Sequence, residues 1–107
     1  MATELNNETF QKEVLDYKEG PVLVDFHAPW CGPCQMMGPI IDELGSEVEG
    51  SGIKVFKVDV DAQQELAQKF GVMSIPTLII FKDGKPKETM MGVQQKENLK
   101  SMLEANK

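Results

Sequence analysis

The chain has 107 residues, 41% of them apolar, which is enough to bury the core of one domain, residues 1–107, but not of two. Its net charge of -6 argues against a nucleic-acid partner, because binding to phosphates requires clustered Lys and Arg. No apolar run approaches the roughly twenty residues of a membrane span, and the opening MATELNN lacks the features of a signal peptide, so we expect a soluble, cytoplasmic protein, with nothing that demands more than a monomer.

The first half of the chain alternates helical and strand patterns. An apolar face over residues 10–17 predicts a helix that ends at Gly20, and residues 22–26 form an apolar run typical of a strand buried on both faces. Residues 37–48 repeat apolar side chains at helical spacing, and residues 53–60 read as another strand. This alternation is typical of an α/β fold.

The second half begins with a short helix that Asp61 is expected to cap and that Gly71 ends. Residues 77–81 and 88–91 predict two strands joined by a tight turn at Asp83-Gly84. An apolar face at residues 99–103 predicts a last helix. We therefore expect a central mixed β-sheet that is flanked by helices on both faces.

The two cysteines of the chain, Cys31 and Cys34, lie within four residues of each other. If Pro33 opens the long helix, Cys31 lies at its amino end and Cys34 in its first turn, close enough for a readily reduced disulfide. Free N–H groups and the helix dipole favour a thiolate on Cys31, which makes it the candidate nucleophile. Cys34 is expected to be more enclosed and to resolve the mixed disulfide that Cys31 forms.

Two other readings of the cysteine pair remain open. Cys-x-x-Cys is half of a zinc site, although tetrahedral zinc needs four ligands and only His27 adds a further candidate of that kind. A purely structural disulfide is the second alternative, but such bridges usually close longer loops in secreted domains.

Asp25 is a carboxylate inside the apolar stretch VLVDF. If it is buried, desolvation raises its pKa, and it becomes a candidate acceptor for the Cys34 proton. Lys57, in the next predicted strand, is the available counter-charge if the two strands are adjacent. The alternatives are that Asp25 faces water at the strand end and that Lys57 lies on a solvated face.

The motif WCGPC at 30–34 after an apolar strand, Asp25 inside that strand and SIPT at 74–77 together resemble the thioredoxin family. The resemblance covers essentially the full length, because Pro39 in the helix, the turn at 83–84 and Gly92 also fall where that family has them.

The resemblance implies a mixed sheet of four or five strands and a general protein-disulfide reductase. It implies that Cys31 attacks, that Cys34 resolves and that Asp25 with Lys57 transfers the proton. A shallow apolar surface would accept the target chain, with the backbone of one member, Ile75, pairing to it as an added strand. That surface comprises Trp30, Gly32, Pro33, Met73, Ile75, Gly92 and Val93, with Pro76 in the cis form facing the cysteines.

The same resemblance implies that the redox group is the disulfide of Cys31 and Cys34, with no bound cofactor and no metal. The expected partners are target proteins with disulfides and a thioredoxin reductase, because nothing in the chain resembles a dinucleotide-binding G-x-G-x-x-G. A disulfide oxidase or isomerase, or a binding subunit without turnover, are the alternative functions.

Two positions depart from the family pattern. His27 replaces a common Trp and places the only imidazole of the chain near the site, while Gln35 replaces a common Lys after Cys34. His27 either tunes the site or is simply packed there. Trp30 either contacts targets or covers the core.

Overall fold

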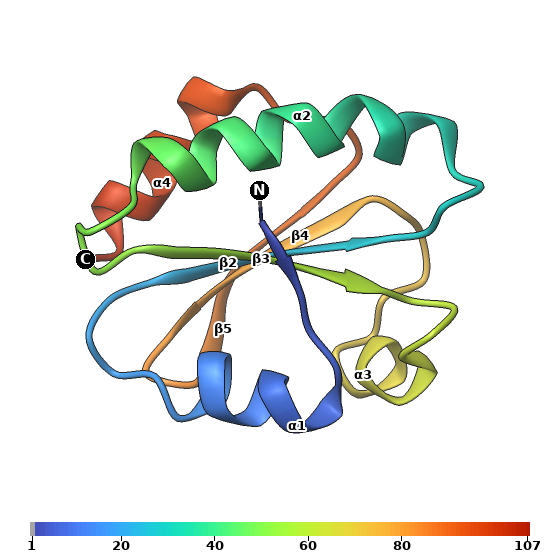
Figure 1. The fold of residues 1–107 in the computed structure, drawn as a ribbon, viewed down its shortest axis with the longest axis horizontal. Coiled ribbons are helices and arrows are strands. Elements are labelled where there is room, and N and C mark those ends of the chain that lie inside the picture. The colour runs from blue at the N-terminus through green and yellow to red at the C-terminus, as the bar shows by residue number, and fades with distance from the viewer. Residues whose placement is uncertain (1) are drawn as a thin grey trace.

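The computed structural model describes residues 2–107, and over this range the chain forms a five-stranded sheet covered by helices on both faces (Figure 1). The elements in chain order are β1 Thr3–Glu4, α1 Asn7–Phe10, the π-helical segment η1 Gln11–Leu15, β2 Val22–His27, α2 Gly32–Glu47, β3 Lys54–Asp59, α3 Gln64–Lys69, β4 Thr77–Lys82, β5 Lys85–Met91 and α4 Lys96–Ala105. Within residues 2–107, none of the helices combines the length and apolar character that crossing a bilayer requires.

The sheet has the strand order β1-β3-β2-β4-β5 and is mixed, as predicted. β1, β3 and β2 run parallel to one another, whereas β4 is antiparallel to β2 and β5 is antiparallel to β4. β2 is therefore a central strand with a partner on each side. Its residues 22–26 are all buried, which explains the uninterrupted apolar run in the sequence.

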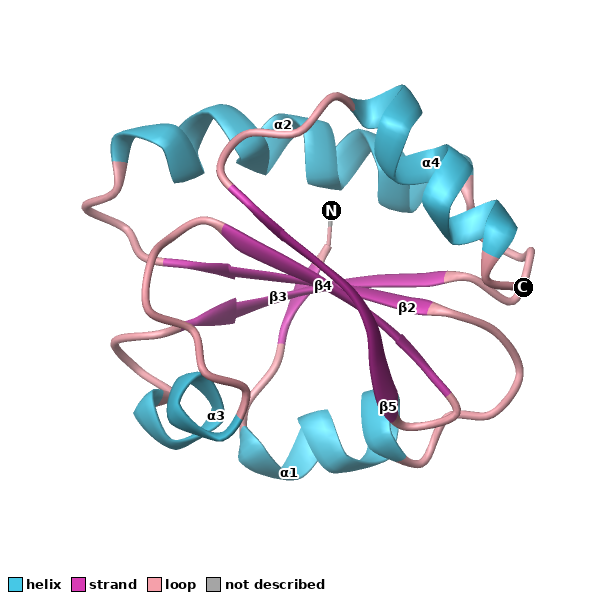
Figure 2. Cartoon of the chain, turned by 180° about the vertical axis from the view of Figure 1, so that it is seen from behind, coloured by secondary structure: helices cyan, strands magenta, loops and turns pink. Residues whose placement is uncertain are grey.

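The helices form two layers. α2 and α4 cover one face of the sheet, and α1 and α3 cover the other (Figures 1 and 2). Successive side chains of β2 point to opposite faces, so Val24 and Phe26 pack in the core beneath α1 and α3, while Leu23 packs beneath α2. By the same alternation Asp25 and His27 face α2, and this places both of them beneath the cysteine-bearing helix.

The predicted first helix is longer than the observed one. α1 and η1 together end at Leu15, so Tyr17 lies beyond the helix and its hydroxyl donates a hydrogen bond to the Gly52 carbonyl oxygen at 2.7 Å. The loop that follows passes so close to residue 52 that a Cβ at Gly20 would overlap the same carbonyl. This close approach requires glycine at position 20 and leaves no room for the helix to continue.

The expected cap of α3 is also wrong. α3 begins at Gln64, and the turn before it is held by the Asp59 carboxylate, which accepts hydrogen bonds from the N–H groups of Asp61 and Ala62. The Asp61 side chain is therefore free to contact another part of the molecule. Gly71, with φ +66°, follows the end of α3 as predicted.

The hairpin between β4 and β5 confirms the turn predicted at 83–84. Asp83 and Gly84 have φ values of 54° and 78°, the combination that a two-residue hairpin turn with two positive φ angles requires. β5 begins at Lys85, earlier than predicted, because its first residues are exposed and polar and give no apolar signal. β1 was not predicted at all, since two residues are too few to show a pattern.

Candidate functional site

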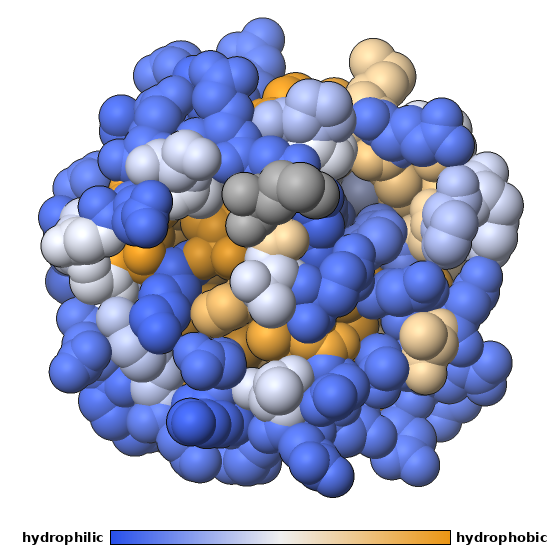
Figure 3. Space-filling view, viewed as in Figure 1, coloured by the Kyte–Doolittle hydropathy of each residue, from blue (hydrophilic) through white to orange (hydrophobic). Residues whose placement is uncertain are grey.

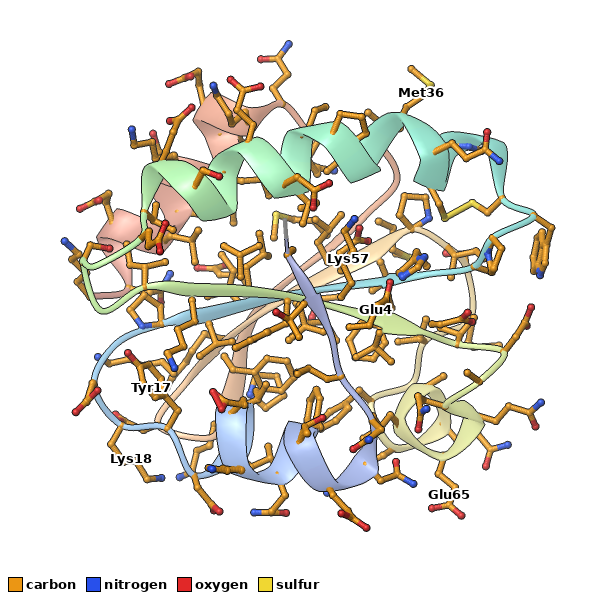
Figure 4. The ribbon with its side chains drawn as sticks, viewed as in Figure 1. Glu4, Tyr17, Lys18, Met36, Lys57 and Glu65 are labelled. Atoms are coloured by element: carbon orange, nitrogen blue, oxygen red, sulfur yellow. A yellow bond between two sulfur atoms is a disulfide. The ribbon has the colours of Figure 1, made fainter. Side chains whose placement is uncertain are left out.

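Cys31 and Cys34 are joined by a disulfide at the amino end of α2 (Figure 4). Their Cα atoms lie 5.2 Å apart, within the range that disulfides require. Cys31 is the N-cap of α2 and its sulfur accepts the Cys34 N–H at 3.2 Å, so the helix begins at Gly32 and Pro33 is its second residue, one position later than expected. Proline is tolerated at the first or the second position of a helix, because the N–H groups of the first turn have no partner within the helix.

The two cysteines are equally enclosed in the disulfide form. Each is 5% exposed, so the expected greater burial of Cys34 is not observed. They differ in their surroundings: Cys34 lines a small cavity that is partly open to solvent, whereas the Cys31 sulfur lies 3.8 Å from the Ile75 carbonyl oxygen on the side of the exposed surface. The first turn of α2 carries no charged side chain, so the free N–H groups and the helix dipole are what favour a thiolate on Cys31.

Asp25 is buried, which rules out the alternative that it faces water. It is 1% exposed, and its Oδ1 atom has no hydrogen-bond partner among the described residues. Burial raises the pKa of Asp25 to about 6, although His27 and then Lys57 attract the carboxylate and oppose this effect. A carboxyl group with a pKa near neutrality is suited to accept and release a proton in the physiological range.

A cavity of about 180 Å³ joins Asp25 to Cys34. Residues of β2, β3, α2 and the loop before α2 line this cavity. Its lining residues are Asp25, His27, Ala28, Pro29, Cys34, Gln35, Gly38 and Lys57. The volume is large enough to admit water.

Lys57 lies beside Asp25 in the parallel register of β2 and β3, as expected from the sequence. Its side chain is only 14% exposed, so it is not on a solvated face. Its ammonium group, however, forms its salt bridge with Asp42 of α2 at 3.2 Å. Lys57 therefore acts on Asp25 by electrostatic attraction, as the expected counter-charge, while its salt bridge is with Asp42.

Glu4 and Asp42 are polar members of this cluster that sequence reasoning missed. Glu4 pairs in register with Lys57, and Figure 4 shows the two side chains near each other between the sheet and α2. The Glu4 carboxylate also contacts His27, with 2.7 Å between Oε2 and Nε2. Their contacts with Lys57 and His27 could not be predicted from the sequence, because they depend on the order of the strands in the sheet.

The predicted target surface is only partly exposed: Gly32 and Pro33 are exposed, Ile75 and Gly92 are half-buried, and Pro76 is buried. Trp30, Met73 and Val93 are 69%, 97% and 44% exposed, so Trp30 does not cover the core. The Ile75-Pro76 bond is cis, as the resemblance implies, and the Pro76 carbonyl accepts the Gly92 N–H at 2.8 Å.

Trp30 is held in place despite its exposure. Its indole N–H donates to the Asp61 carboxylate at 2.6 Å, which is the contact that Asp61 makes in place of the expected helix cap. Met36 and Met91 are two further exposed apolar residues, 63% and 68% exposed. The sequence analysis singled out neither of them, although each lies next to a more buried methionine.

A larger hollow, of about 570 Å³, lies away from the disulfide. β1, β3 and the carboxyl end of α2 enclose it, and apolar atoms are visible on the otherwise mostly hydrophilic face where it opens (Figure 3). The described residues that line it include no cysteine and no histidine, so we place the redox site at the smaller cavity. Within residues 2–107, no three His, Cys, Asp or Glu side chains are grouped to hold a metal ion.

Comparison with known proteins agrees with this geometry. A model of the family described as Thioredoxin matches residues 1–105. The thioredoxin of Bacillus subtilis is 50% identical over 95 residues, covering 89% of this chain and 90% of that protein. Thioredoxin 1 of Nostoc sp. is 47% identical over 103 residues, covering 96% and 94%. The thioredoxin of Rickettsia felis is 46% identical over 99 residues, covering 92% of each.

Proposed function

The chain belongs to the thioredoxin family, and we propose that it reduces disulfides of many target proteins with electrons supplied by a separate thioredoxin reductase. It is a protein-disulfide oxidoreductase whose redox group is its own Cys31–Cys34 disulfide. The observation that carries the proposal is the position of that disulfide, between an exposed apolar surface and a cavity that contains a buried carboxyl group.

Reduction of a target begins from the dithiol form. The Cys31 thiolate attacks one sulfur of the target disulfide, which breaks that bond, forms a mixed disulfide and releases the first target thiolate. Cys34 gives its proton to Asp25 across the cavity and then attacks the Cys31 sulfur. The second target thiolate leaves, so the target gains two electrons and the chain ends as the disulfide seen in the structure.

Target binding uses the surface around Cys31. The exposed side chains of Trp30, Met73 and Val93 support apolar contact with a target chain, and the backbone of Ile75 is available to pair with it as an added strand. Gly32, Pro33 and Gly92 leave the approach to Cys31 open, since a Cβ at either glycine would meet nothing within 4 Å.

We place this activity in the cytoplasm, in a single domain acting as a monomer. A dithiol carrier needs a compartment where a reductase keeps thiols reduced, and the cytoplasm is such a compartment. Both reacting thiols lie in one chain, so one copy is sufficient for a complete cycle.

The decisive experiment compares Cys31→Ser with Cys34→Ser in the reduction of insulin disulfides. Cys31→Ser should abolish reduction, whereas Cys34→Ser should accumulate a covalent mixed disulfide through Cys31, detected by mass spectrometry. Equal trapping by both variants would contradict the assigned roles. Activity of the Cys31→Ser, Cys34→Ser double variant would instead favour a binding subunit without turnover.

The direction of electron flow is tested by the reduction potential of the pair, measured by equilibration with a thiol buffer and alkylation of free thiols. A reductase should be more reducing than about -220 mV. A value of about -180 to -120 mV, the range of isomerases and strong oxidants, would reverse the proposed direction.

The target surface is tested by Met73→Ser, which should raise KM for a protein target several-fold and leave kcat nearly unchanged. Met36→Ser is the matched control, because this exposed methionine points away from the sheet on the outer side of α2 (Figure 4). Equal effects of the two substitutions would contradict a specific contact at Met73.

A further inference from the structure

His27, the single histidine of the sequence, is close to the buried carboxyl group along the chain and is held by a contact with Glu4. It lies two residues after Asp25 on β2, so both side chains point to the same face of the sheet. The imidazole is 18% exposed, and its Nε2 atom lies 2.7 Å from the Glu4 carboxylate. The His27 side chain points from β2 toward α2. Glu4, on the edge strand β1, contacts its ring and so helps to orient it.

Asp25 and His27 line the same cavity as Cys34. The other cation of the cavity, Lys57, has its ammonium group committed to Asp42 at 3.2 Å. The Asp25 Oδ1 atom has no hydrogen-bond partner among the described residues, so its charge depends on the groups that share the cavity. His27 is therefore placed to act on it electrostatically.

We propose that His27, held by Glu4, is a positioning residue that sets the charge on Asp25 and thereby the pH range in which Asp25 takes the Cys34 proton. The inference rests on the proposed role of Asp25 in resolution. No contact between His27 and the reacting sulfur atoms is required, because the imidazole acts through the carboxylate.

Charged groups from each neighbouring element face this pair, and their signs decide the direction of the effect. Glu4 lies on β1, Lys57 and Asp59 on β3, and Asp42 on α2. Lys57 is a cation throughout the neutral range and the three carboxylates are anions there. An imidazole is the side chain that ordinarily changes charge between pH 5 and 8, so His27 is the member that can switch.

The sign of the coupling follows from the charges. Burial raises the pKa of Asp25, His27 and then Lys57 lower it, and Glu4 and Asp42 raise it. A positive charge on the imidazole thus favours the Asp25 carboxylate. Without that charge, Asp25 holds its proton more firmly.

The test is a pH titration of Asp25 in the full-length oxidised protein, with the carboxyl carbons of aspartate labelled with ¹³C and Asp25 assigned through Asp25→Asn. His27→Gln should raise the Asp25 midpoint by about half to one pH unit, the effect of one charge roughly 7 Å away in a partly solvated site. His27→Lys, which carries a permanent charge, should lower it. A purely structural role of His27 cannot produce shifts of opposite sign.

Glu13→Gln is the matched control, because Glu13 also accepts a salt bridge across elements, from Lys54 at 3.2 Å, but does not line the cavity. It should leave the Asp25 midpoint unchanged. Midpoints that coincide in His27→Gln, His27→Lys and the unmodified chain would overturn the proposal, provided that the amide spectra show each variant folded.

The second readout is the pH profile of mixed-disulfide resolution, followed by rapid mixing of the reduced protein with a disulfide target. The profiles should move in the same directions as the Asp25 midpoints. Midpoints that shift while the profiles stay fixed would overturn the kinetic half of the proposal and the role of Asp25. Disulfide reduction through Cys31 would persist in that case, which separates this failure from a failure of the proposed function.

Discussion

Replacing Asp25 by asparagine measures what a buried carboxylate costs the folded protein. Burial raises the pKa of Asp25 from 3.8 to about 6, so the folded state binds this proton more tightly than the unfolded chain does. A group of this kind favours folding most below its unfolded pKa, and its contribution is lost as the pH rises through the folded pKa. The cost of the carboxylate is therefore fully developed above about pH 7.

The magnitude follows from the two pKa values. They differ by about two, and a difference of one corresponds to about 1.4 kcal/mol, so ionised Asp25 costs about 3 kcal/mol at pH 8. At pH 5 the folded carboxyl group is still mostly protonated and the cost is about half as large. Asp25→Asn should therefore raise the free energy of unfolding by about 1 to 2 kcal/mol more at pH 8 than at pH 5. The difference between the two pH values cancels the pH-independent cost of burying an amide.

Urea unfolding of the oxidised protein, followed by far-UV circular dichroism at both pH values, provides the measurement. Asp42→Asn is the control. Burial of Asp42 is outweighed by hydrogen bonds from the Ala2 N–H, at 2.8 Å, and from Lys57, which hold the pKa of Asp42 below its usual value. That substitution should destabilise the protein by nearly the same amount at pH 5 and pH 8, since Asp42 is ionised at both. A gain from Asp25→Asn that is equal at the two pH values would refute the reasoning.

Two further substitutions, each paired with a second variant, test one contact beside the site and one at the turn between β4 and β5. Lys57→Met leaves Asp42 without its ion partner and should cost about 1 to 3 kcal/mol, and in a double-mutant cycle Asp42→Asn should cost less in this background than alone. Gly84→Ala should cost more than about 2 kcal/mol, because φ is 78° and the new Cβ would overlap the Leu15 carbonyl oxygen. Gly92→Ala has φ 85° but open space and should cost only about 1 kcal/mol, so equal urea midpoints for the two glycine variants would exclude an effect of the Leu15 contact.

The parts of the fold that sequence reasoning predicted are those in which neighbouring residues carry the signal. The strand at 22–26 is buried on both faces, so every residue reports its environment, and the turn at 83–84 needs two positive φ angles that Asp and Gly tolerate. The cysteine pair belongs to this class, because three residues at a helix start bring Cys31 and Cys34 together whatever the rest of the chain does.

The parts that sequence reasoning missed depend on contacts between distant segments. The first helix stops at Leu15 because the loop after it approaches residue 52, and no residue between 10 and 17 encodes that approach. Lys57 is the expected counter-charge beside Asp25 in the strand register, but nothing in the sequence indicated that its salt bridge would be with Asp42 of α2. A lysine side chain is long enough to reach either carboxylate, and the one that also accepts the Ala2 N–H remains ionised without the penalty of full burial.

The surroundings of the two thiols imply that this chain controls attack and resolution separately. Cys31 depends on the amino end of α2, since Gln35 supplies no charge in the first turn, and backbone dipoles do not titrate. Cys34 shares its cavity with Asp25 and His27, and burial raises the pKa of Asp25 to about 6. Substitutions in the cavity should therefore change the pH dependence of resolution without slowing the first attack.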